Sequence, residues 1–196
     1  AEIYTELDGR SDKLICELTP PAVMDDPKFV KKKGQIFAVG ANKKWELKVD
    51  FKYQGYPVTG KILLRSVGSY VDNPGLTMFR HDRVICGLTD PQLRCVPKKI
   101  YKTPNKFSGM RLYGELDLDG APVSYTKDKF VFDEDDFAQA LLDNTPQLNE
   151  FMDQAERHRK SGYVSVANEE EIEAYFIKLE QEKTKQANSS GAGNSK

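Results

Sequence analysis

The length, composition and charge of this chain exclude several classes of protein. Its 196 residues, of which 39% are hydrophobic and 30% charged, are enough for one domain with a buried core. The formal net charge of −1 gives no overall attraction to nucleic acid or to an acidic membrane. No apolar stretch approaches the roughly 20 residues of a membrane span.

The cysteines and the N-terminus bear on the compartment. Cys16, Cys86 and Cys95 are odd in number and lack CxxC spacing, which argues against a disulfide framework and against a zinc site. The first ten residues have no signal-peptide pattern, and we expect a cytoplasmic protein. Because the chain starts at Ala1 rather than at a methionine, we expect it to be a fragment of a longer protein.

Alternating hydrophobic residues predict β-strands in the first half of the chain. Residues 1–34 are interrupted by prolines and are expected to be a lead-in from a preceding domain. Residues 45–53 place apolar side chains on one face and charged side chains on the other, as a half-buried strand does. A second strand is predicted over 58–67, and two short runs flank His81 and Asp82 at the spacing of a tight hairpin.

The middle of the chain combines a long loop with one more strand. Residues 88–109 are rich in proline, lysine and asparagine and are expected to form a loop, and loops of this length are often functional. Alternation over 111–119 predicts a strand with its leucines facing inward. Gly120 to Pro122 then turn the chain into a short polar stretch that contains Lys127.

Helix-start signals occur three times in the last third of the chain. Asp133 is expected to cap the first helix, and Thr145 is expected to cap the second. Asn168 and Glu171 have nearly the spacing of a capping box and are expected to start the third.

Strands followed by helices are typical of an α+β domain. We expect this domain over residues 35–160, a C-terminal helix over 161–182, and a disordered tail over 183–196, where little remains to bury.

The predicted loop at 88–109 contains a basic cluster with two aromatic residues, Tyr101 and Phe107. Lysines that alternate with aromatic rings can bind a nucleic-acid backbone and stack on unpaired bases. The alternative is a solvated loop whose aromatic rings fold back onto the sheet, and the sequence favours this alternative. The candidate nucleic-acid residues are Lys98, Lys99, Lys102 and Lys106.

Other clusters have simpler interpretations. The acidic residues at 117, 119 and 133–136 could bind a hard metal ion, but those at 133–136 lie at a predicted helix start, where negative charge is favourable. His81 and Asp82 could act in acid–base chemistry, although a role in the hairpin turn fits them better. The sequence contains neither a GxSxG element nor a glycine-rich phosphate-binding motif.

Two segments of the sequence resemble a known family. Gly75–Ile85, GLTMFRHDRVI, followed by Leu112–Phe130, LYGELDLDGAPVSYTKDKF, resembles the transducer domain of GHKL ATPases. This superfamily includes gyrase B, MutL and the heat-shock chaperones, and the MORC proteins and related microbial ATP-binding proteins are most similar to this chain. The resemblance covers about residues 57–142.

The resemblance implies a fold and a function. The fold would be a two-layer domain of the ribosomal-protein S-five type, with a mixed sheet and helices on one face. In this family a lysine of the transducer reaches the terminal phosphate of ATP, which is held with Mg²⁺ mainly by a preceding ATPase domain. The matching residue is Lys127, beside Thr126, and Lys129 is the competing candidate.

The same comparison limits what this chain could do alone. The motifs by which an ATPase domain holds magnesium, activates water and closes over ATP are absent from these residues. The resemblance therefore implies a module without a complete active site, whose partner is an N-terminal GHKL ATPase domain and whose full-length protein forms a homodimer. The alternative, from a different class, is a free-standing nucleic-acid- or protein-binding module that uses the 88–109 loop.

Overall fold

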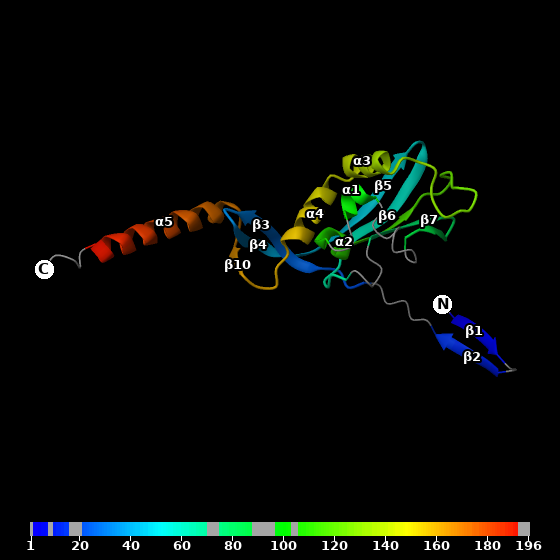
Figure 1. Cartoon of the computed structure of the whole chain (residues 1–196), viewed down its shortest axis with the longest axis horizontal. Helices are drawn as coiled ribbons and strands as arrows, with labels where there is room; N and C mark the ends of the chain where they lie inside the picture. The colour runs from blue at the N-terminus through cyan, green and yellow to red at the C-terminus, as the bar shows by residue number, and fades with distance from the viewer. Residues whose placement is uncertain are drawn as a thin grey trace.

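Figure 1 shows the computed structural model of the chain, which describes residues 2–7, 10–15, 21–69, 75–87, 97–102 and 106–191, with side chains between residues 21 and 185. The strands are β1 (Glu2–Leu7), β2 (Arg10–Ile15), β3 (Asp25–Lys32), β4 (Gln35–Lys44), β5 (Glu46–Tyr53), β6 (Tyr56–Leu64), β7 (Gly75–Arg80), β8 (Arg83–Cys86), β9 (Leu112–Asp117) and β10 (Tyr163–Val166). The helices are α1 (Lys98–Tyr101), α2 (Phe107–Arg111), α3 (Glu134–Asn144), α4 (Gln147–Arg157) and α5 (Glu170–Gly191).

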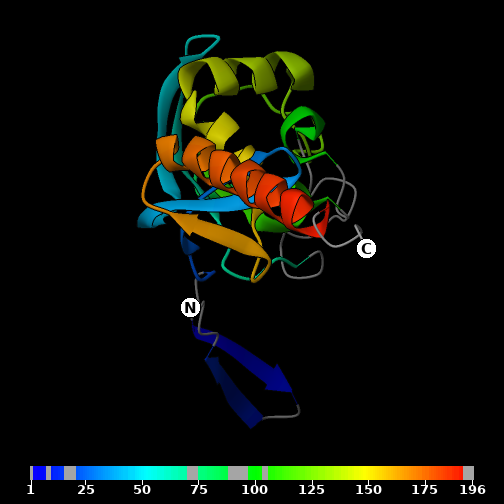
Figure 2. The same cartoon turned by 90° about the vertical axis from the view of Figure 1, so that its left-hand side faces the viewer.

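The described strands form three sheets. β1 and β2 pair with each other, three strands pair in the order β10-β4-β3 (Figure 2), and five strands pair in the order β5-β6-β9-β7-β8. Strand β7 is parallel to β9 and β10 is parallel to β4, whereas the other pairs are antiparallel. Both larger sheets are therefore mixed, and the predicted α+β class is confirmed.

The predicted alternation of β5 and the predicted hairpin turn between β7 and β8 are both confirmed. Val49 and Tyr53 are buried, and the alternate charged residues of β5 are exposed. The β7–β8 turn consists of His81 and Asp82, with φ angles of 50° and 59°. Positive φ at both central residues is the type I′ geometry, whose twist matches that of the flanking strands.

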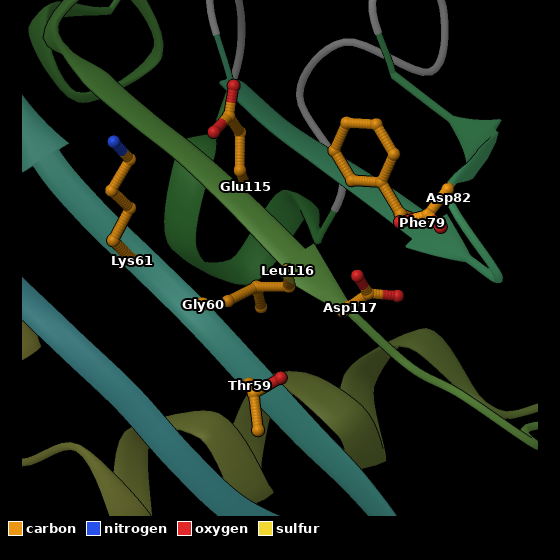
Figure 3. Close-up of a pocket in the computed structure, with 8 residues that line it drawn as sticks. All are labelled: Thr59, Gly60, Lys61, Phe79, Asp82, Glu115, Leu116 and Asp117. Atoms are coloured by element: carbon orange, nitrogen blue, oxygen red, sulfur yellow. The ribbon is translucent and has the colours of Figure 1, made fainter.

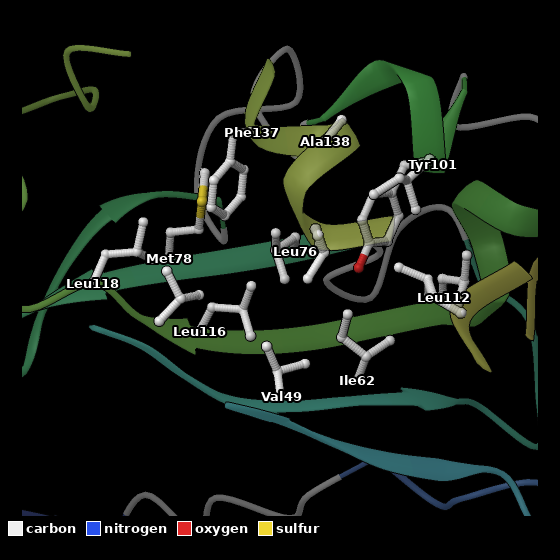
Figure 4. Packing of buried hydrophobic residues seen from close by; sticks show 14 of the residues in the cluster. Val49, Ile62, Leu76, Met78, Tyr101, Leu112, Leu116, Leu118, Phe137 and Ala138 are labelled. Carbon is white, nitrogen blue, oxygen red and sulfur yellow. The ribbon is translucent and has the colours of Figure 1, made fainter. Parts of the chain in front are cut away.

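The main core lies between the five-stranded sheet and the helices on one of its faces. Figure 4 shows Phe137 and Ala138 of α3, and Tyr101 of α1, above Leu76 of β7 and Leu116 of β9. All five side chains are almost fully buried. This arrangement follows from the alternation along the strands, which leaves one apolar face that only packed helices can remove from water.

The two larger sheets meet at Trp45, between β4 and β5. Its backbone N–H donates to the Met24 carbonyl (3.0 Å), and its carbonyl accepts from the Leu64 N–H (2.9 Å). The indole Nε1 donates to the carbonyl of Asp26 (2.9 Å), and the ring packs edge-on against Phe151 of α4. Trp45 is fully buried, so one residue, through its backbone and its side chain, joins both sheets and a helix.

A buried glutamine holds α4 against β3. Gln154 accepts a hydrogen bond from the Phe29 N–H (2.8 Å) through Oε1 and donates one to the Pro27 carbonyl (2.9 Å) through Nε2. Proline has no N–H to donate to the strand ladder, and the register of β3 shifts between Asp26 and Lys28. Gln154 thus satisfies backbone groups that the bulged strand leaves beside the helix.

Two predicted helix caps are confirmed and one differs. Asp133 accepts from the Asp136 N–H (2.9 Å), and Asn168 accepts from the Glu171 N–H (3.1 Å). For α4 the cap position is occupied by Pro146, with no side-chain hydrogen bond, and Thr145 is buried instead.

Three predicted boundaries also differ from the structure. The end of the lead-in at residue 34 would cut the β3–β4 hairpin, since β3 pairs with β4 along its length. The expected loop at 88–109 includes α1 and the start of α2. The range 161–182 includes β10, and α5 continues to Gly191 instead of losing regular structure from Lys183. Glutamate, lysine, glutamine and alanine favour helix without needing burial.

None of the helices in the described ranges has both the length and the apolar character that crossing a bilayer requires.

Replacing Gln154 by alanine tests the junction between β3 and α4. Gln154→Ala leaves the Phe29 N–H and the Pro27 carbonyl buried without partners, and we expect the free energy of unfolding to fall by about 2–4 kcal/mol. Urea unfolding followed by circular dichroism measures this loss. Gln147→Ala, at an exposed site of the same helix, should change it by less than about 0.5 kcal/mol. Equal effects of the two variants would contradict the assigned role.

Candidate functional site

The loop that contains Lys127 is a closed hairpin. Val123 forms an isolated antiparallel bridge with Phe130, and the Ser124 N–H donates to the Lys129 carbonyl (2.9 Å). Within it, the Lys127 N–H donates to the Ser124 carbonyl (2.9 Å), which closes a β-turn over residues 124–127. The short polar stretch expected after Pro122 is thus closed by one bridge and a turn.

Asp128 fixes the conformation of this turn. Its Oδ1 accepts from the hydroxyls of Ser124 (2.6 Å) and Thr126 (2.7 Å), while its N–H donates to Ser124 Oγ (3.2 Å). These hydrogen bonds to the carboxylate, from Ser124 first and then from Thr126, lower the pKa of Asp128 below its ordinary value. The loop is therefore ordered by its own polar side chains although it is exposed.

Lys127 is held in a left-handed backbone conformation, with φ at 57°. This region costs a non-glycine residue on the order of 1 kcal/mol and is usually filled by glycine or asparagine. The side chain of Lys127 is exposed, and it makes no ion pair or hydrogen bond with any side chain in the described part of the molecule. Its ammonium group is available to an external anion.

Lys129 has a different electrostatic setting. It is also exposed, but its positive charge contributes to the lowered pKa of Asp128. The negative carboxylate of Asp128 therefore partly offsets the charge of Lys129 inside the loop. Thr126 does not point a free hydroxyl outward, because it donates to Asp128. Of the three predicted phosphate-contacting residues, Lys127 is the least compensated, and Thr126 acts in closing the loop.

The base of the loop is anchored by stacked aromatic rings. Phe130 stacks on Phe132 with ring centroids 5.4 Å apart, and Phe132 stacks on Phe137 of α3 at 4.8 Å. Tyr53 of β5 packs edge-on against Phe132 and Phe137. In Figure 1 the yellow-green loop lies at the end of the molecule opposite α5, so a fixed base carries an exposed tip.

The four lysines proposed for nucleic acid do not form one free surface. Lys99 Nζ donates to Gln139 (2.6 Å) and Lys102 Nζ donates to Glu156 (3.1 Å), whereas Lys98 contacts Glu134 through its backbone N–H (2.6 Å). Lys106 is exposed at the start of α2.

The two aromatic residues of this cluster are separated. Tyr101 is fully buried in the core, whereas Phe107 is 43% exposed, with the guanidinium of Arg159 lying 5.6 Å from its ring. Phe107 and Lys106 keep the pairing of an exposed ring with an adjacent charge that the sequence pattern suggested, and the side chain of Lys98 is exposed as well. The charges of Lys99 and Lys102 bind the α1 segment to α3 and α4.

A shallow open cavity of about 430 Å³ lies on the outer face of the five-stranded sheet, opposite the helices. Figure 3 shows Lys61 and Glu115 side by side on β6 and β9, and Asp117 and Asp82 near Phe79. Burial, followed by the charges of Asp119 and Asp82, raises the pKa of Asp117. Lys127 does not line this cavity, which contains no nucleophilic side chain activated by a base.

The remaining candidate groups are structural. The His81 N–H donates to Asp119 Oδ1 (2.6 Å), and its ring Nδ1 lies 3.3 Å from the same oxygen. His81 therefore fastens the β7–β8 turn to the end of β9, as the turn interpretation predicted. Across the ranges that the structure describes, no three or more Asp, Glu, His or Cys side chains are grouped as a metal site.

No protein-family model matches this chain, and no curated protein shows significant sequence similarity to it.

The sequence analysis proposed Lys127 but gave no role to two other residues of its loop. Asp128 closes the turn, and Tyr125 at its tip is completely exposed. The signal for Asp128 is present in the sequence, since serine, threonine and aspartate side chains are favoured in turns because they hydrogen-bond to nearby groups. The exposure of Tyr125 has no such local signal.

The pKa of Asp128 provides a test of the loop geometry. Because its folded-state pKa is lowered, this carboxylate stabilises the loop above the ordinary pKa of aspartate, and the stabilisation is lost as the pH falls through the lowered value. We expect Ser124→Ala to raise the pKa of Asp128 toward its ordinary value, because the largest cause is removed. A carboxyl ¹³C NMR titration measures it, with Ser165→Ala on β10 as control. An unchanged titration in Ser124→Ala would contradict this geometry.

Proposed function

We propose that this chain is the transducer module of a GHKL-type ATPase and that Lys127 senses the terminal phosphate of ATP. The ATP and its Mg²⁺ would be held by a separate, preceding ATPase domain. The module would have no complete active site of its own and would couple the presence of the phosphate to closure of the two domains. A cytoplasmic location and a homodimer of the full-length protein are parts of the same proposal.

One observation carries this proposal: the strained and uncompensated position of Lys127. Three described lysines have a left-handed φ, and strained non-glycine residues often mark functional sites. Lys102 is paired with Glu156 and Lys33 lies over the Phe176 ring, whereas Lys127, with φ at 57°, has no side-chain partner in the described residues. The Asp128 hydrogen bonds keep this conformation in place. Such an arrangement makes sense where the ammonium group must be presented outward at a defined point.

The fold is compatible with the same proposal. A mixed five-stranded sheet with helices on one face is the type of architecture that the resemblance implies. The first resembling segment forms the β7–β8 hairpin, and the second begins as β9, which pairs with β7 in parallel. The two segments are thus neighbours in space. We include the finer ribosomal-protein S-five-type topology in the proposal.

Lysine suits the sensing role because of its chemistry. Its ammonium group is a compact charge on a flexible stem, which can reach across a domain interface to a phosphate. Loss of the terminal phosphate on hydrolysis removes that attraction, so the closed arrangement is favoured only while ATP is bound. A rigid loop base limits the motion to the domains themselves, which can then occupy two arrangements.

The nucleic-acid alternative receives less support from the geometry. It needs an exposed basic surface with stacking rings, whereas Tyr101 is buried and Lys99 and Lys102 are engaged within the chain. A salt-dependent retention of this chain on nucleic acid, abolished by neutralising Lys106 and Lys102, would restore that alternative.

Substituting the sensor lysine tests the proposed function. In the protein that joins this module to its ATPase domain, we expect Lys127→Ala to slow steady-state ATP hydrolysis about a hundredfold, the usual scale for losing a charge-stabilising contact. Lys129→Ala should have a smaller effect, and Lys48→Ala, on the outer face of β5, should have none. Hydrolysis by Lys127→Ala at the unmodified rate would refute the assignment of Lys127, and a loss confined to Lys129→Ala would transfer the role to Lys129.

A further inference from the structure

Tyr125 is the most exposed large apolar side chain in the described residues, at 102% of its reference accessibility. Val131, at the base of the same loop, is 57% exposed. A tyrosine removes roughly 150–250 Å² from water when it is buried, and aromatic residues are enriched at protein–protein interfaces. The loop therefore carries apolar surface that the chain itself leaves uncovered.

The position of Tyr125 is fixed rather than incidental. It is the first central residue of the turn that Ser124 and Lys127 close. The carboxylate of Asp128 stabilises this turn by accepting hydrogen bonds from the hydroxyls of Ser124 and Thr126. An aromatic side chain on an ordered turn loses little backbone entropy on binding, which favours it as a docking group. Tyr125 and Lys127 are two residues apart on one rigid tip, so they would meet the same partner surface.

The charges around the tip limit the kind of partner. Lys127 and Lys129 are positive, but Asp128 lies between them, and acidic residues 133–136 follow at the start of α3. A long polyanion that crossed the tip would also meet these carboxylates and would be repelled. A single anionic group recessed in a protein surface would meet only the tip. The arrangement favours a protein with a localised anion over a nucleic-acid strand.

We propose that Tyr125 inserts into an apolar depression on the nucleotide-holding partner domain, beside the phosphate that Lys127 contacts. This inference rests on the proposed function and adds a second contact to it. Tyr125 supplies docking that does not depend on nucleotide, because its contact is apolar. Lys127 supplies the contact that depends on the terminal phosphate. The partner is therefore recognised by an apolar depression and an anion together.

A site-specific photo-crosslink separates the two contributions. The full-length protein with its ATPase domain carries p-benzoylphenylalanine in place of Tyr125, with or without a non-hydrolysable ATP analogue, and linked peptides are identified by mass spectrometry. We expect links to the ATPase domain in both states. Adding Lys127→Gln should lower the yield only with the analogue. The same crosslinker in place of Tyr163 on β10, another tyrosine with an exposed side chain, should give no such link.

Hydrolysis rates provide the second readout. We expect Tyr125→Ser to slow ATP hydrolysis about tenfold, which corresponds to about 1.4 kcal/mol, and Tyr125→Phe to retain the unmodified rate because the contact is apolar. An unfolded variant is not expected, since the side chain is fully exposed.

The outcomes distinguish the inference from the proposed function. If position 125 gives no link to the ATPase domain while Lys127→Ala still slows hydrolysis, the docking role is refuted and the sensor role stands. If position 125 gives no link to the ATPase domain and Lys127→Ala hydrolyses ATP at the unmodified rate, the docking role and the sensor role are both refuted. Links from position 125 to nucleic acid instead of protein would also overturn the inference.

Discussion

The burial of Trp45 is the constraint on which the rest of this structure depends. The residue lies where the chain passes from the three-stranded sheet into the five-stranded sheet. Its backbone and indole bind the carbonyls of Met24 and Asp26 at the start of β3 and the N–H of Leu64 in β6. Its ring supports α4 through Phe151. A buried tryptophan needs a partner for its N–H, and Trp45 finds that partner in Asp26 while its backbone binds Leu64, so the residue favours the observed position of the two sheets.

The candidate site depends on this framework indirectly. The helices cover one face of the five-stranded sheet, and α3 begins where the Lys127 loop ends. Stacking from Phe137 through Phe132 to Phe130 transmits the rigidity of the core to the base of the loop. The polar tip then needs only Asp128 to order it. A buried apolar base and a self-bonded polar tip together explain how an exposed lysine keeps a strained backbone conformation.

The other features proposed as sites differ from this loop in one physical respect. Lys99 and Lys102 have an amide and a carboxylate partner inside the chain, and His81 is bound to Asp119. Their charges are used to hold elements together. His81 and Lys102 also have positive φ angles, but both have partners inside the chain. The Lys127 ammonium group has no such partner in the described part of the chain, and the Tyr125 ring is uncovered. We regard that contrast as the physical basis for assigning function to the loop.

The sequence by itself determined what depends on near neighbours along the chain. The inward faces of β5 and β9, the turn at His81 and Asp82, and the cap at Asp133 all follow from patterns that span two to four residues. Only the tertiary structure decided that β9 lies between β6 and β7 and that Tyr101 is part of the core rather than a stacking platform. It also decided that Gln154 accepts the hydrogen bond of the Phe29 N–H in β3 and that Tyr125 remains uncovered. These outcomes depend on residues distant in sequence, whose packing energies no local pattern contains.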